Sequence, residues 1–410
     1  MYIYLKSIKH QINMRKHEPL YRNEIGSILK NLRKQHHLTL EEGAEGICSV
    51  SYLSKVENNM IIPNSRYLDL FKEKYKIDFS SQKNNINFNE VIHLFLEKDK
   101  VKFFEFNNHL DYQSILNNYL GYILLNQLSE ANQLFEEVTH YIKNYDQDEL
   151  ALYLYGTSIL LKEEGRLKDA FNVLTLMNEK VSHKELNLLI DKEKLILSFF
   201  TNDHGYILLH YDVVINRLVN LGLYEDVNEM KFLHLNYLMQ FMRLDEFLEE
   251  LAEASYLKHY EKTYLKAKIN YLNQRYEDSY KLIIGKERLN QAFYLLSLQI
   301  MNKLKYKENI FELINHPYEK LNKNEELAIK YLKYKFLNQK EEQLSFIREQ
   351  ILKQNDFPDT QDLLNFWYEE GMENLRKNNY YKEASSLSDL IFKKYKNLRI
   401  YIDWLYILVW

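Results

Sequence analysis

Apolar and polar positions follow a helical period in the stretch from residue 24 to residue 71. Its first segment carries four apolar residues at i, i+3, i+4 and i+7, which is one face of a helix: Ile25, Ile28, Leu29 and Leu32. Thr39 then stands three residues before Glu42, a capping box that predicts the start of a second, short helix. Ser49 can cap a third helix, in which Leu53 and Val56 lie three residues apart and face inward.

Two short helices joined by a tight turn and braced by a longer one are typical of the helix-turn-helix arrangement. Its last helix enters the major groove of DNA. The pattern therefore predicts a DNA-binding domain over residues 20–76, preceded by an N-terminal extension over residues 1–19.

The order of landmarks in this domain resembles the Cro/C1-type (XRE) helix-turn-helix family. The turn at Leu38 and Thr39, the small Ala44 inside the second helix, the run Val56-Glu57-Asn58-Asn59 and the following Pro63 match in sequence order. The resemblance implies a structural ion pair between Arg33 and Glu57, for which the planar fork of Arg is well suited.

Three residues depart from the pattern of that family. Leu40 stands where a DNA-touching Gln is usual, so one habitual contact should be missing. Gly43 replaces a common core Leu, and we expect it to weaken the second helix by about 1 kcal/mol relative to Ala. Asn59 replaces a common Gly, but Asn also tolerates a left-handed turn.

By the same resemblance, the base-edge positions of the third helix are Val50, Ser51 and Lys55. Lys55 can donate to guanine O6 and N7 or to a phosphate. The NH groups at the start of the second helix can face a phosphate. For each residue, the alternative is an ordinary solvated surface position. The candidate DNA-binding residues are Thr39, Ser49, Val50, Ser51, Tyr52, Lys55 and Asn58.

The distribution of charge supports this prediction, although the net charge of −4 does not. Residues 1–76 carry 13 Lys and Arg against 8 Asp and Glu, which is +5, so the remaining residues carry −9. A basic head on an acidic body fits a DNA-reading domain joined to a domain with another task. The alternative is ordinary charge scatter, because the excess is modest.

The rest of the chain shows an internal repeat. Residues 77–90 gather Ser and Asn and lose helical periodicity, which predicts a linker, and helical patterns then continue from residue 91 to residue 410. The segment 235–240 recurs 34 residues later as segment 269–274, and 34 is the period of tetratricopeptide repeats. We therefore predict an all-α fold with seven or eight degenerate tetratricopeptide-like pairs in a right-handed superhelix.

Such a superhelix has a concave groove, lined by the first helix of each pair, that suits an extended peptide. Asn and Gln can satisfy a peptide backbone, because each offers a donor and an acceptor. The alternative is that these residues reflect the general abundance of Asn in this chain. The candidate peptide-binding residues recur at repeat spacing: Asn236, Gln240, Asn270, Asn273 and Gln274.

Composition excludes several other classes. The single cysteine, Cys48, rules out an internal disulfide framework and fits a reducing cytosol. No apolar run reaches the roughly 20 residues that span a bilayer, and no signal-peptide pattern is present. Phosphate-binding glycine loops, HExxH and GxSxG are absent. We expect a cytoplasmic protein that is not an enzyme, with no catalytic residue, cofactor or metal site.

The combined architecture resembles the peptide-pheromone receptors of Gram-positive bacteria, the Rgg, PlcR, PrgX and NprR group (RRNPP), with the arbitrium receptors of phages as relatives. The resemblance implies a cytoplasmic homodimer that binds a pseudo-palindromic DNA operator. It also implies quorum-sensing control of transcription by a short signalling peptide. The alternative is a helix-turn-helix and repeat scaffold that a protein partner regulates.

Overall fold

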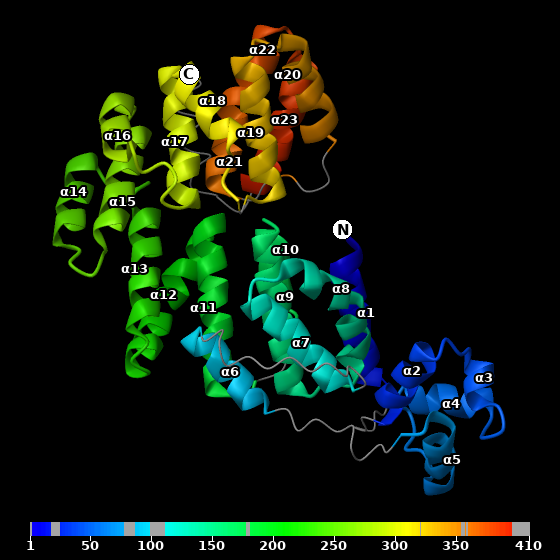
Figure 1. Cartoon of the computed structure of the whole chain (residues 1–410). Coiled ribbons are helices and arrows are strands. Elements are labelled where there is room, and N and C mark those ends of the chain that lie inside the picture. Colours follow the sequence, from blue (N-terminus) through cyan, green and yellow to red (C-terminus); the bar gives the residue numbers. More distant parts are fainter. Residues whose placement is uncertain are drawn as a thin grey trace. The chain divides into compact units, whose positions relative to one another are not determined.

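The computed structural model describes residues 2–17, 25–77, 87–98, 111–177, 181–319, 321–353, 357 and 360–395. Every regular element in these ranges is a helix (Figure 1), which confirms the predicted all-α fold class. None of these described helices is both long and apolar enough to cross a membrane. Most of the predicted linker, residues 78–86, lies outside the described residues.

The head, residues 25–77, consists of four helices: α2 (Ile25–Gln35), α3 (Leu40–Ala44), α4 (Val50–Glu57) and α5 (Ser65–Tyr75). All four contribute to one apolar core, and the face predicted for the first helix is the face that α2 buries. The fully buried members of the core are Ile28, Leu29, Leu32, Ala44, Leu53, Val56, Phe71 and Tyr75.

Local hydrogen bonds fix where the short helices of the head begin. The Thr39 side chain accepts from the Glu42 N–H, and the Glu42 carboxylate accepts from the Thr39 N–H, so the predicted capping box is formed. The Ser49 hydroxyl accepts from the Tyr52 N–H and caps α4. Asn59 adopts a left-handed conformation with φ of 54°, as expected for the turn after α4.

The helices beyond the head form consecutive pairs joined by short turns. Those before residue 221 are α6 (Phe88–Glu97), α7 (Tyr112–Leu124), α8 (Leu128–His140), the 3₁₀ turn η2 (Tyr141–Lys143), α9 (Gln147–Glu163), α10 (Leu167–Leu174), α11 (Lys184–Thr201) and α12 (His204–Asn220). Those after it are α13 (Tyr224–Leu238), α14 (Leu244–Glu253), α15 (His259–Leu272), α16 (Tyr276–Ile283), α17 (Gln291–Leu304), α18 (Lys307–Asn315), α19 (Lys323–Phe336), α20 (Lys340–Phe346), α21 (Gln361–Phe366), α22 (Met372–Lys377) and α23 (Tyr381–Tyr395).

Two segments are π-helical turns, η3 (Ile347–Ile351) and η4 (Trp367–Gly371), and each continues the helix that precedes it. Such turns often occur at functional sites, because the extra residue per turn changes the direction of the following side chains. Trp367 in η4 is completely buried, and Gly371 packs closely against Leu387 of α23.

The turns within the pairs share one backbone feature, a residue with positive φ. The residue after the first helix takes a left-handed conformation, which ends the helix and satisfies its last carbonyl groups. Asn is the residue other than Gly that adopts this conformation most readily, so the chain forms these turns with only 10 glycines. The left-handed residues at these turns are Asn126, Gly165, Asn202, Gln274, Lys305, Asn338 and Asn379.

The chain forms two compact units, residues 1–161 with 169–190, and residues 162–168 with 191–410. The first unit contains the head. It also contains the helices α7 and α8, and these two helices lie side by side (Figure 1). The predicted extension forms α1 (Tyr2–His17), which packs against α8 and η2. The domain boundaries predicted at residues 19, 76 and 90 stay predictions.

Candidate functional site

Helix α4 presents one side to solvent and buries the other. Leu53 and Val56 are 1% exposed in the head core, whereas Ser51 and Lys55 are exposed and Val50 is 39% exposed. The start of α4 is therefore a small, solvent-facing surface with one cation, one hydroxyl and one apolar side chain. A major groove offers partners for each of these groups: phosphates and guanine acceptors for the Lys, base edges for the Ser and thymine methyls for the Val.

An ion pair ties α4 to α2. Arg33 Nε donates to Glu57 Oε1 at 2.7 Å, and Arg33 Nη2 donates to Glu57 Oε2 at 2.8 Å, as the resemblance implied. Arg33 Nη1 also donates to the Leu38 carbonyl at 2.8 Å. The hydrogen bond to Glu57 raises the pKa of Arg33. The two side chains are 13% and 4% exposed, so the pair fixes the position of α4 against α2 from inside the head.

Gly43 makes room for this ion pair. A Cβ at Gly43 would lie 2.6 Å from Arg33 Cδ and 3.1 Å from Leu53 Cδ2. The bulky residue expected from the family pattern would therefore collide with the stem of Arg33. Glycine weakens α3, but its lack of a side chain lets the Arg33 side chain pass directly over it and reach Glu57.

Three other candidate residues have local structural tasks. The hydroxyl groups of Thr39 and Ser49 accept hydrogen bonds at the starts of α3 and α4, and their own protons stay available to a phosphate. The half-buried Tyr52 accepts from the Asn64 N–H at 3.0 Å, and its ring packs 4.9 Å from that of Tyr67. Tyr52 therefore braces the start of α5 as well as flanking the exposed side of α4.

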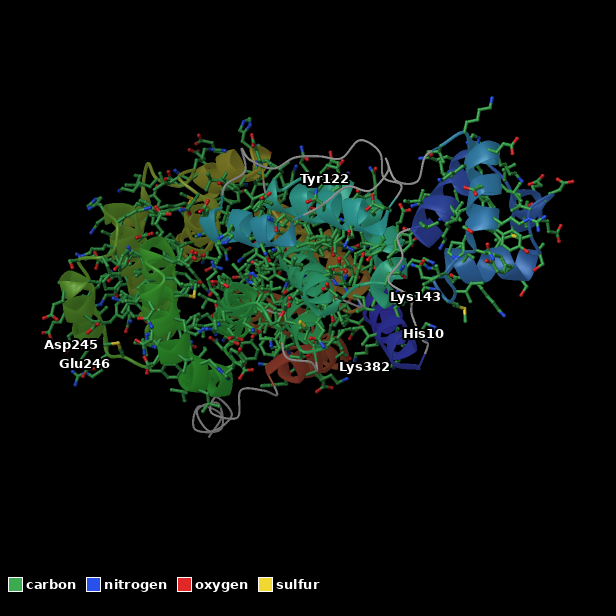
Figure 2. The ribbon with its side chains drawn as sticks, turned by 90° about the horizontal axis from the view of Figure 1, so that it is seen from below. His10, Tyr122, Lys143, Asp245, Glu246 and Lys382 are labelled. Carbon is green, nitrogen blue, oxygen red and sulfur yellow. The ribbon has the colours of Figure 1, made fainter. Side chains whose placement is uncertain are left out.

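The last candidate, Asn58, connects the head to the repeat body. Its side-chain nitrogen donates to the Ser54 carbonyl at 2.8 Å, and its Oδ1 accepts from Lys143 Nζ at 3.0 Å. Lys143 is labelled in Figure 2 and belongs to the same compact unit as the head. Sequence reasoning missed this contact, because Lys143 is 85 residues away in η2 and belongs to no motif.

None of the five predicted peptide-binding residues is among those that line the cleft between α15, α17 and η4. Asn270 is buried and donates to the Lys266 carbonyl of its own helix, and Asn273 donates likewise to the Ile269 carbonyl. Gln240 bonds to Asn202 at 3.1 Å. The two remaining candidates differ in exposure: Asn236 is half-buried, and Gln274 is exposed and has a left-handed backbone conformation.

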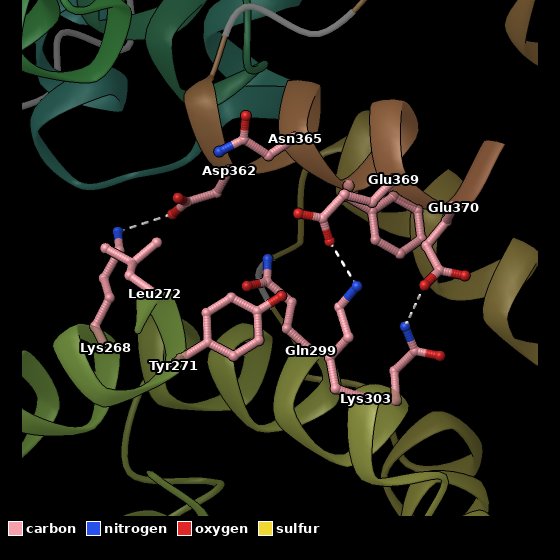
Figure 3. A pocket seen from close by; sticks show the side chains of 11 residues that line it. Lys268, Tyr271, Leu272, Gln299, Lys303, Asp362, Asn365, Glu369 and Glu370 are labelled. Atoms are coloured by element: carbon pink, nitrogen blue, oxygen red, sulfur yellow. Dashed lines mark hydrogen bonds and ion pairs between the residues drawn. The ribbon is translucent and has the colours of Figure 1, made fainter. Parts of the chain in front are cut away.

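The cleft lies between α15 and α17 on one side and α21 with η4 on the other (Figure 3). Ion pairs cross it: Lys268 Nζ lies 3.0 Å from Asp362 Oδ2, and Lys303 Nζ lies 2.6 Å from Glu369 Oε2. The next residue, Glu370, accepts from Asn302 at 2.9 Å. Both carboxylates belong to the π-helical turn η4, and their partners Lys303 and Asn302 are adjacent residues of α17.

The cleft is small, with a volume of about 50 Å³, and its lining combines charged and amide side chains with apolar ones. That volume holds a few water molecules. Burial alone would lower the pKa of both lysines. Glu369 raises the pKa of Lys303 and Asp362 raises that of Lys268 by more, so both ammonium groups stay charged at neutral pH. The cleft thus contains two ammonium groups, each paired with a carboxylate of the same cleft.

Metal and thiol chemistry find little support in the described residues. No group of three or more His, Cys, Asp and Glu side chains within them could hold a metal ion. The thiol of Cys48 is half-buried in the head, and burial raises its pKa, so it is a weak nucleophile at neutral pH.

The head matches a known family. Residues 29–80 match the Helix-turn-helix family model HTH_3, so the chain carries a helix-turn-helix domain at this end. Among solved structures, the chain is similar to Bacillus thuringiensis PlcR in a crystal structure with the peptide PapR7 and DNA. The two are 17% identical, the alignment covers 80% of this chain and 99% of that chain, and the TM-score is 0.17. No curated protein sequence matches the chain.

Proposed function

We propose that this protein is a sequence-specific, DNA-binding transcription regulator whose activity is switched by a short signalling peptide bound in its repeat body. The observation that carries the DNA-binding part is the exposed side of α4, held in place by the buried Arg33–Glu57 pair within a domain that matches the helix-turn-helix family. The proposed readers are Val50, Ser51 and Lys55, with Thr39, Ser49, Tyr52 and Asn58 as flanking contacts.

The protein works as a cytoplasmic homodimer on a pseudo-palindromic operator in this proposal. One head offers few phosphate contacts, so useful affinity needs two heads on half-sites set apart by whole turns of the DNA helix. Synthetic duplexes selected from random sequence by the full-length protein test this: the enriched sites should contain two inverted half-sites. Enrichment of single half-sites, or of none, would count against the dimeric reader.

The peptide-binding part is supported by the chemistry of the cleft between α15, α17 and η4. Lys268 and Lys303 meet Asp362 and Glu369 there, so a peptide with a free carboxylate and a free amino group finds a partner of each sign. Exchange of ion pairs costs less than creating new buried charges, because each ammonium group keeps a carboxylate partner. We also place extended peptide backbone against the exposed side chain of Gln274 and the side-chain oxygen of Asn273, whose nitrogen is bonded to the Ile269 carbonyl.

A peptide should stabilise the folded protein through this cleft. We expect C-terminal fragments of a small secreted propeptide encoded beside the gene to raise the melting temperature by roughly 2 °C or more at saturating concentration. The double variant Lys268→Gln with Lys303→Gln should lose the shift. The matched control is Lys333→Gln, an exposed position at the end of α19, which should keep it.

The rival function is a scaffold regulated by a protein partner. It predicts that no short peptide shifts the melting temperature of the wild-type protein, and that the α12 surface, where Leu208 and Leu209 are 79% and 74% exposed, becomes protected when that partner binds. Hydrogen exchange along α12, with and without the peptide fragments, distinguishes the peptide-switched regulator from the partner-regulated scaffold.

A further inference from the structure

The exposed side of α4 continues beyond the helix. Ser51, Lys55 and Asn58 recur at i, i+4 and i+7, so they lie along one side of the helix. Asn58 stands at the C-cap, and its Oδ1 accepts from Lys143 Nζ at 3.0 Å. A cation from the repeat body therefore lies at the end of the row that carries the proposed DNA readers.

Lys143 belongs to a group of basic residues. Lys30 of α2 is hydrogen-bonded to His140 Nε2, and its Nζ lies 5.5 Å from the centre of the Tyr141 ring. Burial, followed by the charges of Lys34 and Lys143, lowers the pKa of Lys30 to about 8. Burial, followed by the charges of Lys30, Lys143 and Lys34, lowers the pKa of His140 to about 4, so this imidazole is neutral at pH 7 and accepts the hydrogen bond.

Carboxylates also act on Lys30 in this group. Glu57 and Glu137 are the two that act on Lys30, and both carboxylate oxygens of Glu57 are already bonded to Arg33. Lys34 and Lys143 lie close enough to Lys30 for their charges to lower its pKa, and Lys143 bonds to the residue that ends α4. Such a concentration of positive charge attracts a phosphate and releases counterions when it binds one.

Two further hydrogen bonds hold the basic group in register with the head. The Ser27 hydroxyl accepts from the Tyr112 N–H at 3.3 Å, and the Tyr141 hydroxyl donates to Asn31 Oδ1 at 3.2 Å. Ser27 is completely buried and Asn31 is 5% exposed. The position of Lys143 relative to α4 is therefore set by packing between α2, α7 and η2.

We propose that Lys143, assisted by Lys30, binds a phosphate of the DNA backbone next to the half-site that α4 reads. The repeat body would then contribute directly to the DNA interface, although Lys143 lies far outside the helix-turn-helix motif. This inference rests on the proposed DNA-binding function. It adds a contact that positions the protein on DNA without reading sequence.

The test measures the salt dependence of DNA binding by the full-length protein. The probe is a fluorescent 30-base-pair duplex of mixed sequence, with affinities taken by anisotropy between roughly 50 and 200 mM salt. Lys143→Gln should lower the slope of log affinity against log salt by about 0.9 per head and weaken binding several-fold. Lys143→Arg keeps the charge and should match the wild type. Lys382→Gln, an exposed position on α23, is the control for loss of a lysine elsewhere.

Several outcomes would overturn the inference. A wild-type slope in Lys143→Gln, with an unchanged melting temperature, would show that Lys143 touches no phosphate. A slope that falls equally in Lys143→Arg would assign the effect to the hydrogen bond with Asn58 rather than to charge. Stabilisation of the wild type by millimolar inorganic phosphate, lost in Lys143→Gln while the DNA slope is unchanged, would indicate a site for a free anion. If wild-type protein shows no salt-dependent DNA binding, the proposed function fails together with this inference.

Discussion

Replacing Glu57 with Ala should lower the free energy of unfolding of the head by about 3 kcal/mol. The substitution leaves the guanidinium of Arg33 buried with one remaining partner, the Leu38 carbonyl, and an uncompensated buried charge is costly. Hydrogen exchange of the α2 and α4 amides in the full-length protein measures the effect. We expect exchange in these helices to become faster by about two orders of magnitude, because 1.4 kcal/mol corresponds to a factor of ten.

The matched control is Glu73→Ala, which removes an exposed carboxylate from α5 of the same head. Its effect should stay within about 0.5 kcal/mol, since exposed charges contribute little to stability. If both variants exchange alike, the Arg33–Glu57 pair does not hold the head together.

Reversing the charge of Lys55 should weaken DNA binding by about tenfold or more for each head. Lys55→Glu removes one phosphate or guanine contact from the exposed side of α4 and places a carboxylate against the DNA backbone. The side chain is exposed and packs in no core, so the fold should be unaffected. Anisotropy with the 30-base-pair duplex measures the affinity, and the melting temperature checks the fold.

Lys382→Glu carries the same charge reversal on an exposed position in the first turn of α23 and should bind DNA like the wild type. Equal losses in the two variants would indicate a general effect of net charge, and an unchanged affinity in Lys55→Glu would rule out α4 as the reading helix.

The sequence predicted the head more completely than the body. The helical pattern of the apolar residues marked the buried face of α2, and Thr39 with Glu42 marked the start of α3, because both signals act within a few residues. The resemblance to the XRE family placed Arg33 and Glu57 opposite each other, at bonding distance in the structure. The role of Gly43 was interpreted as a weakness, because the path of the Arg33 stem across it is a tertiary feature.

The body was predicted as a class of fold and not as a site. The 34-residue recurrence indicated paired helices, and the described part of the chain contains such pairs. The recurrence does not indicate which side chains on the inner helices can bind a peptide. Asn270, for example, donates its side-chain hydrogen bond to the Lys266 carbonyl of its own helix. One side of the cleft carries Glu369 and Glu370 in a π-helical turn, and no sequence motif marks that turn. Lys143 was missed for the same reason, since only folding brings it to Asn58.

The packing of α2 against α7 and η2 has a consequence for the spacing of half-sites in the proposed operator. Ser27 and Asn31 are covered, so this side of α2 cannot meet a second head. In the proposed dimer, we therefore expect the separation of the two heads to depend on the bodies and not on a flexible tether. Inserting about five base pairs between half-sites rotates one of them to the opposite side of the DNA, and inserting about ten restores its direction. Operators spaced in whole turns should be bound and half-turn spacings rejected, whereas loosely tethered heads would accept both.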